Sequence, residues 1–146
     1  MSTCHLIGYA SLAPIPMPLP LAITVRAGQS HFPSPAQDYE QKNLDLNDQF
    51  ISNPPATFIF KVAGDSMVGA GIFPGSTLVV DRSVQPTNGA VVIADVDGEW
   101  MVKRLQRRGG WVRLLSDNPA YPAITLAEGQ DLVVFGVVTY VIHKPE

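Results

Sequence analysis

The sequence predicts a mainly β fold, a compact antiparallel sheet coiled into a small barrel, for three reasons. Six short segments after Pro55 are rich in β-branched and aromatic residues, and Gly, Pro and Asn turn signals separate them. No helical segment lies between these candidate strands, so neighbouring strands should pair antiparallel. The 13 prolines and 12 glycines among 146 residues also disfavour a helix bundle.

Composition limits the classes of protein that this chain can represent. Hydrophobic residues make up 46% and charged residues 16%, so one domain can bury a core and the chain is not disordered. A net charge of −3 disfavours direct DNA binding through a general basic surface. One cysteine and three histidines exclude an internal disulfide and give no zinc-ligand spacing. We therefore expect a cytoplasmic protein without metal or cofactor.

Residues 1–37 are predicted to form a flexible, extended N-terminal arm, followed by a domain at 38–146. Six of the 13 prolines lie in residues 1–35, and Arg26 is the only formally charged side chain before Asp38. The uncharged stretch 6–25 is not a membrane segment, because four alternating prolines interrupt it. No Lys or Arg precedes this stretch, as a secretory signal would require.

The first regular elements are expected after the arm. Leu46, Phe50 and Ile51 have helical spacing and predict a short helix within 38–51, which Asn53-Pro54-Pro55 would end. Strands are then predicted at Thr57–Ala63, Thr77–Asp81, Ala90–Val96, Glu99–Gln106, Trp111–Leu115 and Leu132–His143. The last strand is a long apolar edge, which must be paired or covered in a soluble protein. This predicts a homodimer.

Ser66 is the first candidate catalytic residue. It follows an apolar strand and opens a glycine-rich turn, where a rigid element can aim the hydroxyl and turn amides can stabilise an oxyanion. A Gly-Asp-Ser turn is also common for backbone reasons alone. The motif lacks the final glycine of an esterase nucleophile elbow and has no lysine three residues later.

Lys103 is the second candidate. In the strand Glu99–Gln106 it shares a face with Met101 and Leu105, so its amine could be buried. The alternative is a side chain whose ammonium reaches solvent. Other sites are disfavoured: Asp95, Asp97 and Glu99 surround an Asp-Gly hairpin turn better than a calcium ion. Arginines around Gly109-Gly110 fit a solvated hairpin end, and His31 and His143 lie in no context typical of a catalytic base.

Four motifs together resemble the LexA/UmuD family of self-cleaving serine peptidases, which has a LexA/signal-peptidase-like fold. They are Gly64-Asp65-Ser66-Met67, Asp97-Gly98-Glu99, Val102-Lys103-Arg104-Leu105 and Phe135-Gly136-Val137-Val138. The segments Phe32-Pro33-Ser34-Pro35-Ala36 and Leu44-Asp45-Leu46-Asn47 resemble the UmuD branch. With 27 residues ahead of Gly28, we expect no winged helix-turn-helix domain of a repressor.

The resemblance implies a catalytic dyad and a cleavage site. Ser66 would be the nucleophile, Lys103 the general base and Ala27-Gly28 the scissile bond. This chain has Gln29-Ser30-His31 before Phe32, where relatives pass directly from Gly to Phe, and Met101 where relatives carry a threonine that holds the lysine amine. A signal peptidase shares this chemistry but needs a membrane anchor, which the proline-rich arm cannot provide.

The dyad has a clear physical requirement. A free lysine has a pKa near 10.4, so only about one in a few thousand is neutral at about pH 7. Burial against Met101 and Leu105 favours the neutral amine, which could then take the Ser66 proton during attack on the Ala27 carbonyl. The backbone N–H of Ser66, with a neighbour in the turn, is the expected oxyanion donor.

The resemblance also implies partners. A RecA filament on single-stranded DNA would stimulate cleavage, and the trimmed homodimer would join a UmuC-type, Y-family DNA polymerase in SOS mutagenesis. The chain would then reach DNA through partners, without direct sequence-specific binding. The alternative is a non-cleaving binding module of the same fold, which regulates the polymerase through contacts alone.

Overall fold

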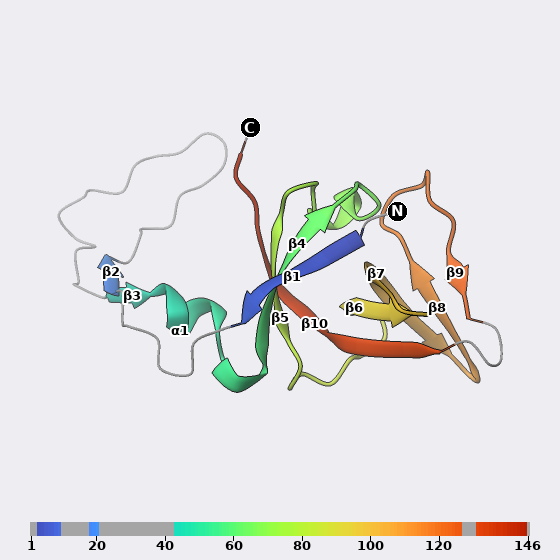
Figure 1. Ribbon diagram of the computed structural model, residues 1–146, viewed down its shortest axis with the longest axis horizontal. Helices are drawn as coiled ribbons and strands as arrows, with labels where there is room; N and C mark the ends of the chain where they lie inside the picture. Colours follow the sequence, from blue (N-terminus) through green and yellow to red (C-terminus); the bar gives the residue numbers. More distant parts are fainter. Residues whose placement is uncertain (1–2, 10–17, 21–42, 127–130, 146) are drawn as a thin grey trace, which may run out of the picture.

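The computed structural model describes residues 3–9, 18–20, 43–126 and 131–145 (Figure 1). The strands are β1 (Thr3–Tyr9), β2 (Pro18–Pro20), β3 (Asn43–Asp45), β4 (Thr57–Ala63), β5 (Thr77–Asp81), β6 (Val91–Val96), β7 (Glu99–Arg108), β8 (Trp111–Leu115), β9 (Ile124–Thr125) and β10 (Leu132–Ile142). The helical elements are α1 (Leu46–Phe50) and the 3-10 turns η1 (Pro54–Ala56) and η2 (Val68–Ala70).

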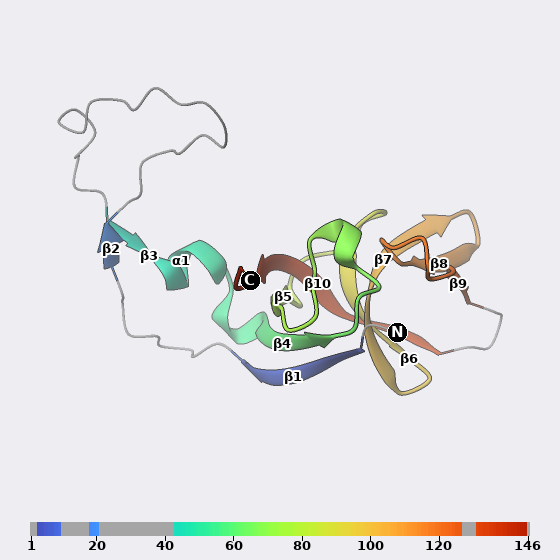
Figure 2. The ribbon, with the colours of Figure 1, turned by 90° about the horizontal axis from the view of Figure 1, so that it is seen from above.

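Six of these strands form a closed antiparallel barrel. The order is β1-β4-β5-β10-β6-β7, and the Thr3–Met101 pair joins β1 back to β7. β8 and β9 extend the sheet beyond β7, while β2 and β3 pair with each other at the opposite end of the molecule (Figures 1 and 2). The predicted mainly β barrel is confirmed.

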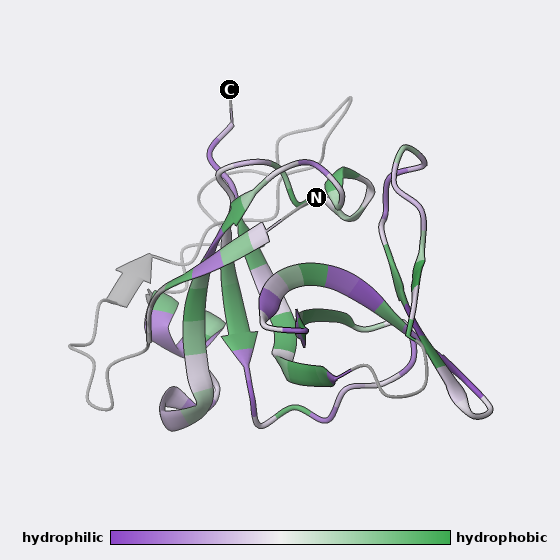
Figure 3. Cartoon of the chain, turned by 45° about the vertical axis from the view of Figure 1, so that its right-hand side comes forward, coloured by the Kyte–Doolittle hydropathy of each residue, from purple (hydrophilic) through white to green (hydrophobic). Residues whose placement is uncertain are grey.

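Two clusters of apolar side chains fill the interior. The strands that contribute them carry many hydrophobic residues, which are coloured green in Figure 3. In β4, Phe60 and Val62 are buried while Lys61 and Ala63 are exposed, because successive side chains point to opposite faces. The first cluster contains Cys4, Phe60, Val62, Met67, Ile72, Leu78, Val80, Ile93 and Val102. The second contains Val92, Ala94, Val96, Met101, Leu105, Leu114 and Val137.

The six predicted strands are all present. Those at Thr57–Ala63, Thr77–Asp81 and Trp111–Leu115 have the predicted bounds, and the others differ by one or two residues. Between β6 and β7, Asp97 and Gly98 have φ angles of 51° and 85° and link the Val96–Glu99 pair. Two central residues with positive φ are typical of the tight hairpin turn that the Asp-Gly pair predicted.

The predicted helix is α1, which ends before Asn53-Pro54-Pro55 as expected. The Asp45 side chain caps its start by accepting a 2.9 Å hydrogen bond from the Asn47 N–H. The Phe50 ring lies 4.9 Å from the Tyr140 ring, edge to face, so the helix packs against β10. Residues 38–42 of the predicted helical stretch lie outside the described residues.

β1 was not among the predicted strands, although it lies within the segment assigned to the arm. It pairs with β4 from Thr3 opposite Ala63 to Tyr9 opposite Phe58. The rest of the arm, apart from β2, lies outside the described residues. Within the part of the chain that the structure describes, no helix has the length and apolar character needed to cross a membrane.

The prediction that Leu132–His143 forms an open edge of the sheet was wrong, because this strand pairs with a neighbour on each side. In β10, Leu132–Val137 pairs with β6 and Val137–Ile142 pairs with β5, so the strand crosses from one neighbour to the other. Gly136 lies close to the point where β10 changes partner, at an irregularity in its pairing with β6. A Cβ there would lie 2.8 Å from the Val80 side chain, so the absence of a side chain lets β10 approach β5 closely. A pairing mode for a homodimer therefore does not follow from this strand alone.

Candidate active site

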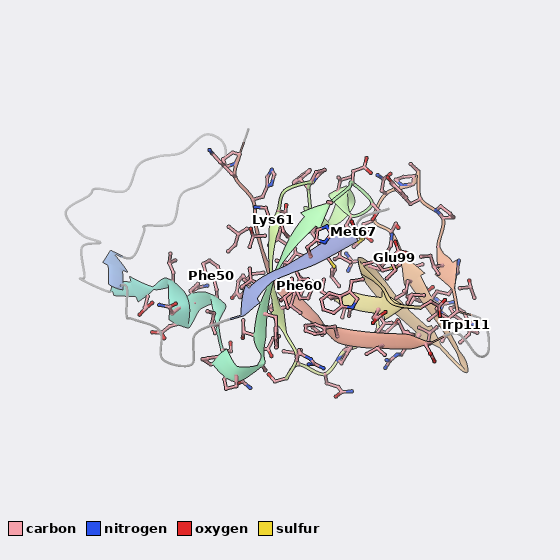
Figure 4. The ribbon with its side chains drawn as sticks, in the orientation of Figure 1. Phe50, Phe60, Lys61, Met67, Glu99 and Trp111 are labelled. Carbon is pink, nitrogen blue, oxygen red and sulfur yellow. The ribbon has the colours of Figure 1, made fainter. Side chains whose placement is uncertain are left out.

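Ser66 lies in the turn between β4 and η2, at one end of the barrel. Gly64 begins this turn with a φ of 90°, a conformation that residues with a side chain rarely adopt. Met67, labelled in Figure 4, is fully buried in the first core cluster and fixes the turn against the barrel. The turn therefore holds the neighbouring Ser66 in one position, with no exposed surface.

Lys103 lies in the middle of β7, opposite Val92 of β6. Its neighbours on the same strand face, Met101 and Leu105, are buried as predicted, and Lys103 itself is 1% exposed. The alternative of an ammonium in solvent is therefore excluded. No ion pair of Lys103 is found among the described residues, whereas its neighbour Arg104 forms a salt bridge with Asp117.

The structure brings the two predicted residues together, although the turn that carries Ser66 and the strand that carries Lys103 lie far apart in the sequence. Nζ of Lys103 donates a hydrogen bond to Oγ of Ser66 over 3.1 Å. Burial lowers the pKa of Lys103, because the charged ammonium loses its hydration. A buried hydroxyl in contact with an amine of lowered pKa can act as a nucleophile with its general base.

Ser116 completes the surroundings of the amine and was missed by the sequence analysis. Nζ of Lys103 also donates a hydrogen bond to Oγ of Ser116 over 2.7 Å. The sequence contained a signal for this contact, namely the two-residue turn Gly109-Gly110. Because Arg108 pairs with Trp111 across this turn, the register of the hairpin places residue 116 opposite residue 103. The hydroxyl that Met101 cannot provide is thus present directly after the end of the adjacent strand, β8.

The loop after β8 packs against the serine turn. The Gly69 N–H donates a 2.7 Å hydrogen bond to the Asp117 carbonyl, and a Cβ on Gly69 would lie 2.5 Å from that oxygen. The Asp117 N–H in turn approaches Sδ of Met67 at 3.3 Å. Only glycine fits at position 69, so the close approach of the two backbones fixes Ser66 relative to this loop.

Two further side chains of the same loop contact Asp65, the residue before the serine. The Asn118 amide donates a 2.9 Å hydrogen bond to the Asp65 carbonyl, and the Tyr121 hydroxyl donates one to the Asp65 carboxylate. This carboxylate raises the pKa of Tyr121. Nζ of Lys103 lies 5.7 Å from the centre of the Tyr121 ring, so the loop borders the amine as well.

Arg104, next to the lysine, contacts the same loop from the other face of β7. Its Nε donates to the Asp117 carboxylate over 3.0 Å, and a second nitrogen forms the ion pair. This pairing lowers the pKa of Asp117. Arg104 is thus engaged within the chain, while Arg107 and Arg108 are exposed at the hairpin end, as predicted.

The remaining predicted sites have plain outcomes. Ala27 and Gly28 lie outside the described residues. The Asp95 carboxylate accepts hydrogen bonds from the Gly98 N–H and the Trp100 indole, which fits a turn rather than a calcium loop. In the ranges that the structure describes, no group of three or more potential metal ligands is found.

Comparisons with known proteins relate this chain to a family of peptidases. A model of the family described as Peptidase S24-like matches residues 20–139, a range that includes Ala27, Ser66 and Lys103. Protein SamA of Salmonella typhimurium is 48% identical over 113 residues, which cover 77% of this chain and 78% of that protein. Protein ImpA of Escherichia coli is 45% identical over 117 residues, 80% of this chain and 79% of that one. LexA repressor 2 of Pseudomonas putida is 38% identical over 107 residues, 70% of this chain and 53% of that one.

Proposed function

The chain belongs to the Peptidase S24-like family, and on this premise we propose that it is a serine peptidase that cleaves itself between Ala27 and Gly28. The observation that carries the proposal is the 3.1 Å contact between Nζ of Lys103 and Oγ of Ser66. Both groups are buried, so their proton exchange takes place away from bulk water. The scissile bond is assigned from the motif alone.

The reaction would proceed in two steps. With the amine neutral, the Ser66 hydroxyl donates its proton to Nζ of Lys103 as Oγ attacks the Ala27 carbonyl carbon. The resulting oxyanion would be held by backbone N–H groups of the serine turn, including that of Ser66. The C–N bond to Gly28 then breaks, and the Lys103 ammonium protonates the departing amine. Water, deprotonated by the same lysine, hydrolyses the Ala27 ester and restores both residues.

The cleavage position is tested by mass. Purified chain incubated at about pH 10, where more of the lysine is neutral, should yield two products that separate residues 1–27 from 28–146. Intact and fragment masses measured under denaturing conditions would identify the bond. A cut elsewhere would refute the assignment of Ala27-Gly28, and a chain that stays intact without partners would favour a non-cleaving module.

Ser116 is expected to position the lysine amine. Ser116→Ala should slow self-cleavage about fivefold, because one hydrogen bond contributes about 1 kcal/mol. Ser116→Thr keeps the hydroxyl and should retain most of the rate. Met101→Thr in the Ser116→Ala chain should recover part of it, since it returns a hydroxyl to the same strand face. These rates are measured across the pH range, and unchanged plateau rates in Ser116→Ala would show that the hydroxyl does not orient the amine.

We further propose the cellular role that the motifs imply. The trimmed chain would act in the cytoplasm as a homodimer and as accessory subunit of a UmuC-type, Y-family polymerase in translesion synthesis. A RecA filament would stimulate cleavage. The alternative of a non-cleaving binding module rested in part on Met101, which lacks the hydroxyl that holds the lysine amine in relatives. The Ser116 hydroxyl lies 2.7 Å from the amine and accepts a hydrogen bond from it, which weakens this alternative.

A further inference from the structure

The N-terminal strand β1 is a structural part of the barrel, although it lies ahead of the proposed cleavage site. β4 lies on one side of β1 over its whole length, and Thr3 pairs with Met101 of β7 on the other. Without β1, β4 and β7 would no longer be joined and both would present unpaired backbone groups. Figures 1 and 2 show β1 lying along β4 in both views.

β1 also contributes to the core beneath the candidate site. Cys4 is 4% exposed and belongs to the cluster that contains Met67, the residue after Ser66. Its neighbour His5 points the other way and is exposed. Loss of β1 would therefore open the core next to the serine turn and along the strand that carries Lys103.

We propose that the fragment of residues 1–27 stays bound after self-cleavage, with β1 remaining as the sixth strand of the barrel. This inference rests on the proposed cleavage at Ala27-Gly28. Breaking that bond removes none of the β1–β4 pairs and none of the Cys4 contacts. The position between β4 and β7 is thus filled by the chain's own strand β1, which is held by the main-chain pairing typical of strand addition.

The single cysteine reports the position of β1 directly. Burial raises the pKa of the Cys4 thiol to about 12, and the thiolate is the form that reacts with alkylating reagents. While β1 is in place, Cys4 should therefore react slowly at neutral pH. Once β1 leaves, it should react like a cysteine in an unfolded chain.

The experiment uses the full chain after complete self-cleavage, verified by denaturing mass spectrometry. Native mass spectrometry and size exclusion should find both fragments together, and Cys4 should be alkylated at least about 100-fold more slowly than in denaturant. Separate elution of residues 28–146, with Cys4 reacting at the denatured rate, would overturn the proposal.

Matched variants test the buried face of the strand. Cys4→Glu places a charge in the core and should release the fragment after cleavage, whereas His5→Glu, on the exposed face, should leave it bound. If Cys4→Glu fails to fold, the alkylation of the unmodified chain still decides the question. Equal retention in both folded variants would contradict the role of the Cys4 contacts.

A failure of the proposed function can be told apart from a failure of this inference. In a Ser66→Ala chain, a recognition site for a sequence-specific protease is inserted between Ala27 and Gly28, so an added protease makes the cut. Retention of the fragment there would support the inference even if the chain never cleaves itself. Its loss would refute the inference whether or not self-cleavage occurs.

Discussion

Replacing Ser66 by alanine, or Lys103 by methionine, is expected to reduce self-cleavage by about a thousandfold or more. Nucleophile and base act as one unit, so either change removes nearly all of the chemical step. Lys103→Met keeps a long apolar side chain in a position that is 1% exposed, so the barrel should remain folded. The fraction of intact chain over time at high pH, measured on denaturing gels, gives the rate.

The controls separate chemistry from folding. Lys61→Met changes an exposed lysine on β4 and should leave the rate within about twofold. Thermal unfolding of all three variants should show cooperative transitions. If folded Ser66→Ala still yields the same fragment, another nucleophile cuts the bond and the dyad assignment fails. If only Lys103→Met remains active, the base is a different group.

Self-cleavage without partners is expected to accelerate steeply with pH, by about tenfold per unit, until the pKa of Lys103 is passed. The direction follows from the base: only the neutral amine accepts the serine proton, and the neutral fraction grows as pH rises toward the pKa. Because burial lowers this pKa, the plateau should begin below the pH at which a free lysine loses its proton.

The pH profile is measured by the loss of intact chain from about pH 6 to about pH 11, a range that spans the ordinary lysine pKa of about 10.4. Fluorescence of the two tryptophans verifies that the domain stays folded at each pH. The Arg104–Asp117 pair should stay charged throughout, since each partner's pKa is moved away from this range. A flat profile in folded protein would argue against lysine as the base, or for a slow step other than the chemistry.

The sequence predicted only part of the candidate site. The Gly-Asp-Ser-Met turn and the lysine between Met101 and Leu105 indicated the two groups of the proposed dyad. The strand pattern alone left the burial of Lys103 open, because alternation defines two faces without saying which one is inside. Closure of the barrel decides it: Val102 and Lys103 are both buried, on opposite faces of β7.

The contact between Ser116 and Lys103 could have been predicted from the register of the β7–β8 hairpin. The sequence predicted both strands and the Gly109-Gly110 turn between them, and residues 103 and 116 follow as partners from that two-residue turn. The contacts of Asp117, Asn118 and Tyr121 with the serine turn had no such signal. They depend on where a loop after β8 meets a turn after β4, and no short-range pattern encodes that distance.

The sequence by itself determined the β class, the antiparallel hairpins and the two candidate residues of the proposed dyad, because turn residues and side-chain alternation are local properties. Only the tertiary structure decided that Thr3–Tyr9 closes the barrel. That segment continues into an apolar, proline-rich stretch without a boundary signal, and its partners on β4 lie 49 to 60 residues away along the chain. Such pairing is fixed by which strand edges remain open once the other strands have assembled.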